Sequence, residues 1–76
     1  MTDMRLYEGT KRLRAKAMTR GEYNNYRNWS APDGEDQDVA GYLVEYEDGG
    51  KANDSRHSGY ISWSPADVFE RTYHAI

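Results

Sequence analysis

Two strand signals separated by a glycine turn, and followed at once by a helix start, limit the fold of this chain more than any other feature. In residues 41–47 (GYLVEYE), side chains alternate with the two-residue period of a strand. Residues 48–50 (DGG) then predict a turn, because glycine tolerates positive φ. Residues 59–63 (GYISW) predict the returning strand, and the polar residues 51–58 are too many for a tight hairpin. We therefore expect an inserted loop, residues 50–58, between paired strands.

A helix is predicted directly after the returning strand. Ser64 is expected to cap it, Pro65 to occupy its first position, and Asp67 to lie in its first turn. An apolar face toward the sheet is then expected from Val68, Phe69, Thr72 and Tyr73.

The first half of the chain predicts one strand and one short helix. In residues 11–17, Leu13, Ala15 and Ala17 alternate with basic residues, which indicates a strand with a basic outer face. A helix is the alternative, because these residue types are also good helix formers. The stretch from Thr19 to Glu22 matches a capping box and predicts a helix that ends near residue 28.

The remaining segments complete the expected organisation. Residues 1–8 are expected to be a flexible end or a short edge segment, and the Pro-, Gly- and acid-rich residues 30–39 an acidic loop. The prediction is one α+β domain over residues 1–76, with a small antiparallel sheet in the order β-α-β-β-α and the C-terminal helix packed on it. Whether residues 10–18 pair with the second or the third strand is open.

Composition restricts the means of stabilising so small a chain. The 76 residues include no cysteine and only two histidines, which excludes disulfides and thiolate metal sites. Tight packing or self-association into a homo-oligomer is left as the source of stability. No apolar run approaches the roughly 20 residues of a membrane span, so we expect a soluble, cytoplasmic protein that does not bind membranes.

Charge is distributed unevenly along the chain, although the net charge is only −3. Residues 1–30 carry seven Lys/Arg and three Asp/Glu, and residues 31–76 carry three and ten. The two halves could neutralise each other in the fold, or an acidic patch could face a basic partner. The acidic second half makes direct nucleic-acid binding improbable.

No pattern in the sequence predicts a reaction. His57 and His74 are far apart, and an Asp54–His57 pair in a polar loop is usually only solvated. Ser64 is assigned to helix capping, and no nucleophile elbow or phosphate loop is present. We therefore predict no catalytic residue, no metal site, no cofactor and no enzymatic activity.

Parts of the chain resemble a family of small tailed-phage and prophage accessory proteins, most of them uncharacterised. The resemblance covers roughly residues 9–73 and is most specific at GYLVEYEDGG (41–50) and GYISWSPADVFE (59–70). It implies a phage origin and gives no mechanism. The resemblance to shorter relatives implies that residues 50–58 are an insertion in this chain.

The sequence leads to one functional hypothesis and one alternative. The first is a phage-encoded protein that binds and inhibits or modulates a host protein, as counter-defence (anti-CRISPR or anti-restriction) proteins do. A nucleic-acid-binding protein of the host is one candidate partner. Its predicted contact residues are Asp33, Glu35, Asp36, Asp38, Glu45, Glu47, Trp29 and Tyr42. The alternative is a module that sequesters a nucleotide, with phosphate held by Arg12, Arg14, Lys16 and Arg27 and a base stacked on Trp29 or Tyr42.

Overall fold

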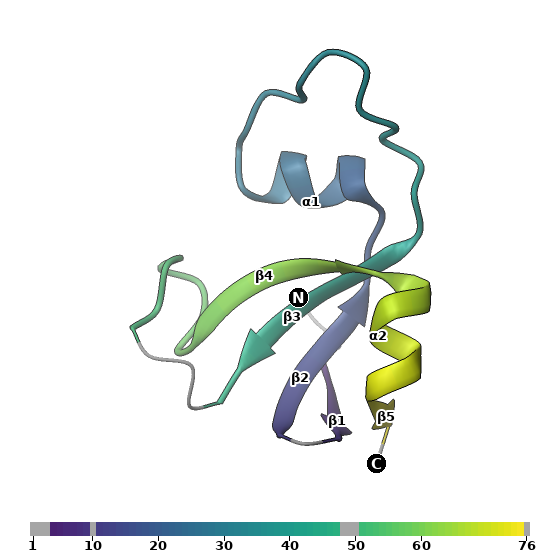
Figure 1. The fold of residues 1–76 in the computed structure, drawn as a ribbon. Coiled ribbons are helices and arrows are strands. Elements are labelled where there is room, and N and C mark those ends of the chain that lie inside the picture. Colours follow the sequence, from purple (N-terminus) through teal and green to yellow (C-terminus); the bar gives the residue numbers. More distant parts are fainter. Residues whose placement is uncertain (1–3, 10, 48–50, 76) are drawn as a thin grey trace.

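The computed structural model describes residues 4–9, 11–47 and 51–75. Its elements are β1 (Arg5–Glu8), β2 (Arg12–Ala17), α1 (Arg20–Tyr26), β3 (Gly41–Tyr46), β4 (Tyr60–Pro65), α2 (Ala66–Thr72) and β5 (His74–Ala75), as Figure 1 shows. The predicted α+β class is confirmed, and so are the two helices. The glycine turn predicted at residues 48–50 lies outside the described residues.

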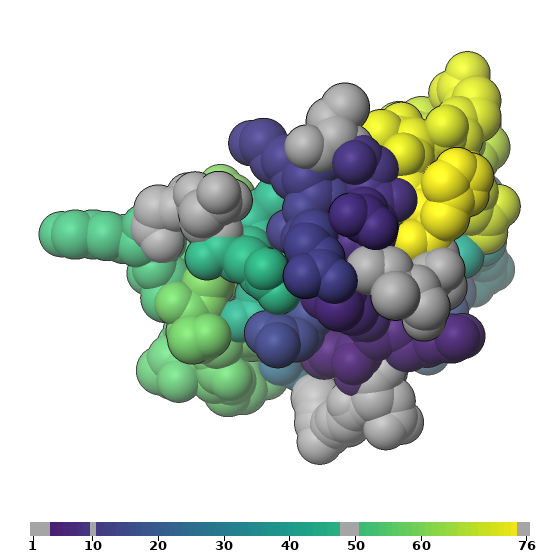
Figure 2. All heavy atoms as spheres, turned by 90° about the horizontal axis from the view of Figure 1, so that it is seen from below, coloured from purple at the N-terminus to yellow at the C-terminus, as the bar shows by residue number. Residues whose placement is uncertain are grey.

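All the strands form one antiparallel sheet in the order β4-β3-β2-β1-β5. The pairing left open by the sequence is therefore resolved: β2 lies against β3, with Ala15 opposite Val44. Residues 1–8 are predicted to be a flexible end or a short edge segment, and residues 5–8 of this stretch form the strand β1, between β2 and the two-residue β5 at the edge of the sheet. Figure 2 shows the N-terminal and C-terminal segments side by side on this edge. In the described part of the chain, neither helix is long and apolar enough to cross a membrane.

The sheet is covered on both faces. On the α2 face, Leu13, Ala15 and Val44 pack with Phe69 of the helix, and four partly buried tyrosines surround them. On the α1 face, Leu43 and Ile61 pack with Tyr23 of α1 and with Met18. Because β3 runs through the middle of both clusters, its residues at positions 43, 44 and 45 are all buried.

The first helix starts as the sequence predicts. Thr19 accepts a hydrogen bond from the Glu22 amide, and the Glu22 carboxylate accepts one from the Thr19 amide, which completes the capping box. The helix ends at Arg27, and Asn28 then takes a positive φ of 61°.

The second helix starts one residue later than predicted. Ser64 still belongs to β4, opposite Tyr42, so its side chain makes no capping bond and Pro65 is the N-cap residue. The predicted apolar face is also narrower than expected, because Val68 and Thr72 are exposed. Phe69 and Tyr73 alone pack into the α2-face cluster.

These two helix starts predict different responses to losing a hydroxyl. We expect Thr19→Ala to lower the free energy of unfolding by about 1 kcal/mol, because an amide at the N-terminus of α1 loses its acceptor. Ser64→Ala is the matched control and should change it by less than about 0.5 kcal/mol. Urea unfolding of the two variants measures both values, and an equal loss in the two would contradict the assignment of Pro65 as the cap.

Candidate functional site

The acidic loop, residues 30–39, and the residue before it are held against α1 by their own backbone. The amides of Arg20 and Gly21 donate to the carbonyls of Val39 and Gln37 at 2.9 and 2.8 Å, and the Trp29 amide donates to the Asn24 carbonyl at 2.8 Å. Both ends of the loop are therefore anchored on the helix, as Figure 1 shows above the sheet.

One acid of this loop is an anchor as well. The buried Asn24 donates from Nδ2 to the carboxylate of Glu35 and to the Gln37 amide oxygen, at 2.9 and 2.8 Å. Arg20 donates to the other Glu35 oxygen at 3.0 Å. The hydrogen bonds from Asn24, and then from Gln37, lower the pKa of Glu35 below its ordinary value. Glu35 is thus engaged within the fold, whereas Asp33, Asp36 and Asp38 are exposed.

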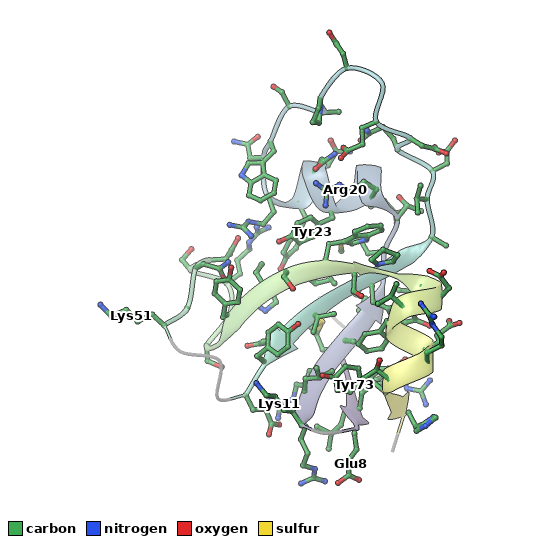
Figure 3. All side chains as sticks on the ribbon, in the orientation of Figure 1. Glu8, Lys11, Arg20, Tyr23, Lys51 and Tyr73 are labelled. Atoms are coloured by element: carbon green, nitrogen blue, oxygen red, sulfur yellow. The ribbon has the colours of Figure 1, made fainter. Side chains whose placement is uncertain are left out.

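A groove lies beside this loop, between α1 and the edge strand β4. Its volume is about 370 Å³, and its lining residues share aromatic or basic character for the most part: Arg20, Tyr23, Arg27, Trp29, Asn53, Tyr60, Ile61, Ser62 and Trp63. Trp29 and Tyr60 are 48% and 43% exposed. The Arg27 guanidinium lies 4.5 Å from the Trp29 ring centre, and Arg20 lies 5.3 Å from that of Trp63. Figure 3 shows Arg20 and Tyr23 on the side of α1 that meets β4. We call this the aromatic groove.

A partly buried hydrogen-bonded chain lies on the same face of the sheet, where the C-terminal end of α1 meets the inserted loop. Glu45 Oε1 is 3.0 Å from His57 Nδ1, and His57 Nε2 is 2.7 Å from the Tyr26 hydroxyl. The second Glu45 oxygen accepts from Ser58 Oγ at 3.3 Å and from the Gly59 amide at 3.0 Å. The side chains of His57 and Glu45 are 5% and 11% exposed.

These contacts decide the charge on Glu45 and the direction of the hydrogen bonds. Burial alone would raise the pKa of Glu45, but the hydrogen bonds from His57 and Gly59 outweigh it and hold that pKa below its ordinary value. An ionised Glu45 requires a proton on Nδ1 of His57, so in the neutral imidazole Nε2 accepts from the Tyr26 hydroxyl. Burial raises the pKa of Tyr26, which keeps this hydroxyl protonated.

The inserted loop is fixed by further contacts. Arg56 donates from Nε and Nη2 to the two carboxylate oxygens of Asp54, at 2.9 and 2.7 Å. Its guanidinium lies 3.6 Å from the Tyr26 ring centre. Hydrogen bonds from the side chain and then the backbone of Arg56 lower the pKa of Asp54. On the open edge of β4, the Ile61 amide donates to Asn53 Oδ1 at 2.8 Å, and Asn53 Nδ2 donates to the Ile61 carbonyl at 2.9 Å. The loop predicted as an insertion is thus folded onto the α1 face.

The residues predicted to contact a partner are divided by the fold. Glu45 is 8% exposed and bound to His57, so its inclusion in an exposed acidic patch is wrong. Tyr42 lies on the α2 face, stacked on Phe69 and donating to Glu70 at 2.6 Å, a bond that raises its pKa to about 12. Glu47 is exposed but follows the far end of β3, roughly 20 Å along the strand from residue 40. Trp29 and the loop carboxylates remain together beside α1.

The residues of the alternative phosphate site are divided as well. Arg12, Arg14 and Lys16 project from β2, whereas Arg27 lines the aromatic groove over β4, with β3 between the two strands. Trp29 packs on Tyr23 on the α1 face, and Tyr42 lies on the α2 face, so of the two rings named for base stacking only Trp29 shares a face of the sheet with Arg14 and Lys16. The nucleotide site stays a prediction.

The Glu45–His57–Tyr26 chain was not anticipated from the sequence. His57 was expected to be solvated beside Asp54, but it is buried, and Asp54 binds Arg56 instead. The three members of the chain are separated by 12 and 31 residues, so no local spacing brings them together. Within the described residues, no group of three His, Asp or Glu side chains could hold a metal ion.

Comparisons with known proteins add no homologue. No family model matches the chain, and no curated protein and no solved structure matches it at a significant level.

The buried carboxylate predicts a specific acid sensitivity. Because the pKa of Glu45 is lowered in the folded protein, its stabilisation is present above the ordinary value of 4.5 and is lost as the pH falls through the folded value. We expect Glu45→Gln to reduce the free energy of unfolding by about 1–3 kcal/mol at pH 7. Its stability should also decline less than that of the wild type between about pH 5 and pH 3.

Chemical denaturation at a series of pH values measures this difference. Glu47→Gln, at an exposed carboxylate two residues along the chain, is the control and should follow the wild-type profile. Parallel profiles for wild type and Glu45→Gln would contradict the assignment.

Proposed function

We propose that this protein is a non-enzymatic, phage-encoded binding protein that attaches to a basic surface of a host protein and inhibits or modulates it. The observation that carries the proposal is the aromatic groove bordered by the acidic loop.

The first support is the composition of the surface. Tryptophan, tyrosine and arginine dominate the energetic centres of protein interfaces. Trp29 is nearly half exposed at the aromatic groove, and Arg27 lies over its indole. This ring offers a large contact area at little conformational cost, because Tyr23 of α1 and Arg27 already restrict it.

The second support is the charge next to this centre. Asp33, Asp36 and Asp38 are exposed on a loop that Glu35 ties to Arg20, itself a residue of the groove. Asp36 Oδ1 accepts from the Asp38 amide at 2.9 Å, and none of the ion pairs among the described residues involves these three carboxylates. Such an arrangement favours a basic partner and accelerates its association. A nucleic-acid-binding protein of the host has a basic surface of this kind, which fits a counter-defence role.

The third support is that the loop is already ordered. Its backbone hydrogen bonds to α1 and the buried Asn24 fix its course before any partner arrives. A preordered loop loses less conformational entropy on binding than a free one.

The charge prediction is tested with two variants of equal charge change. We expect Asp33→Lys with Asp38→Lys to weaken binding of the host partner by about tenfold or more, because both carboxylates would face a basic surface. Glu8→Lys with Asp67→Lys changes the net charge equally, on β1 and α2, and should bind like the wild type. The partner is first captured with the tagged wild-type protein from the bacterial host, and affinities are then measured with both purified proteins.

Equal weakening by the two double variants would show that only net charge matters and would refute a role for this loop. Binding that does not weaken with rising salt would do so as well.

The groove predicts a separate contribution from Trp29. We expect Trp29→Ala to reduce the binding free energy by about 2 kcal/mol or more, because this half-exposed ring lies at the centre of the proposed contact. Val68→Ala, at an exposed side chain of α2 on the other face of the sheet, should leave affinity unchanged. Calorimetric titration of both variants gives the comparison, and normal affinity of Trp29→Ala would exclude the groove as the contact.

A further inference from the structure

The outer edge of β4 presents open main-chain groups. The strand order β4-β3-β2-β1-β5 places β4 at one side of the sheet (Figure 1). The amide and carbonyl of Ile61 both bond to the side chain of Asn53, so they point away from β3. In an antiparallel pair these groups point the same way at every second residue, so those of Trp63 point outward as well. Among the described residues, neither of these Trp63 groups has a hydrogen-bond partner.

The aromatic groove reaches this main chain. Four consecutive residues of β4, numbers 60–63, belong to its lining. Ile61 and Trp63 pack into the α1-face cluster, and alternation along a strand directs Tyr60 and Ser62 to the α2 face. Residues from both faces of a sheet can line one groove only where that groove runs along the backbone at the edge. The groove therefore offers the edge of β4 as well as aromatic side chains.

The open stretch of this edge is short. At one end, Asn53 already occupies the outward hydrogen-bonding groups of Ile61. At the other end, Pro65 has no amide hydrogen and is the N-cap of α2. Trp63 lies between these two limits with its amide and carbonyl open. The site thus accepts a few residues of extended chain, which must leave the edge where Asn53 begins.

A second copy of the chain fits this edge poorly. Symmetric pairing of two β4 strands at Trp63 would place Pro65 of one copy opposite Ile61 of the other, where Asn53 already lies. Because β4 is fixed to β3 along its length, it cannot turn away from Asn53. Each copy also carries a net charge of −3, which opposes association. A separate extended segment can pair at Trp63 and then turn away.

The charges around the groove favour a basic segment. Both arginines in the lining are engaged within the fold, since Arg20 donates to Glu35 at 3.0 Å and Arg27 donates to the Tyr23 hydroxyl at 2.7 Å. The three exposed aspartates of the acidic loop form no ion pair among the described residues. Lysine or arginine residues that flank the paired stretch would therefore meet open carboxylates.

We propose that an extended, basic peptide segment of the host partner adds to the edge of β4, with main-chain hydrogen bonds to Trp63 and a side chain in the aromatic groove. This inference rests on the proposed function and specifies how the partner is held at the same site. The residue opposite Trp63 directs its side chain to the α1 face, because directly paired residues share a face of a sheet.

The probe for this site is the synthetic peptide acetyl-KKVLVKK-amide, titrated into the ¹⁵N-labelled full chain. It should cause saturable amide shifts at Trp63 with a Kd below about 1 mM, because main-chain recognition tolerates many side chains. The Trp63 amide should exchange with solvent quickly in the free protein and slowly in the complex. The Ile61 amide is the internal control, since Asn53 protects it in both states. Absence of saturable shifts, or unchanged exchange at Trp63, would overturn the proposal.

Two methylated peptides separate strand addition from general attraction. One carries an N-methyl group on the central leucine, and the other carries one on each valine. Only alternate residues of a strand bond to a given neighbour, so one peptide should bind at least about tenfold more weakly and the other within about threefold of the parent. Equal effects of the two methylation patterns would overturn the proposal.

The complex with the host partner distinguishes this inference from the proposed function. A partner whose affinity falls with Trp29→Ala, but which leaves exchange of the Trp63 amide unchanged, would overturn strand addition and leave the proposed function standing. A tagged protein that captures no host partner would instead overturn the proposed function, whereas the peptide titration would still decide whether the edge accepts a strand.

Discussion

The burial of the Glu45 carboxylate is the constraint on which the functional face of this protein depends. Glu45 lies on a strand covered on both sides, where an ionised group without partners would be strongly destabilising. Its hydrogen-bond partners are His57, Ser58 and Gly59, which all lie at the end of the inserted loop. The loop must therefore fold onto the sheet. Gly59 can approach closely enough only because it has no side chain, since a Cβ there would collide with the Tyr46 carbonyl.

The two faces of the sheet have different roles as a result. The α2 face is an aromatic core in which Tyr7, Tyr42 and Tyr73 surround Phe69, with ring-centre distances of 4.5–5.2 Å from that ring. These aromatic rings bury one face of the sheet in a short chain that has no cysteine. The α1 face combines apolar packing with the acidic loop, the aromatic groove and a cavity at Tyr26. The proposed partner-binding surface lies on this face.

Local signals were sufficient wherever a short stretch of chain decides its own conformation. The capping box at Thr19 predicted α1, and alternation of side chains predicted β2 and β3. The Ser64 cap failed because β4 continues to Pro65: pairing with β3 requires Ser64 to stay extended, and this tertiary demand outweighs a local capping preference. Local signals did not decide between a flexible end and a strand at residues 5–8, because the stability of β1 comes from neighbours on both sides, β2 and the distant residues of β5.

In the candidate site, too, some features follow from the local sequence and others only from the tertiary structure. The sequence by itself determined the acidic loop, the exposed basic side chains of β2 and the supply of aromatic residues, because composition and period are local properties. Only the tertiary structure decided that Glu45 is internal, that Trp29 and Tyr42 lie on opposite faces, and that His57 bridges Glu45 and Tyr26. The physical reason is that strand alternation assigns a residue to a face but does not say what covers that face. The covering depends on where a loop and a helix distant in the sequence come to rest.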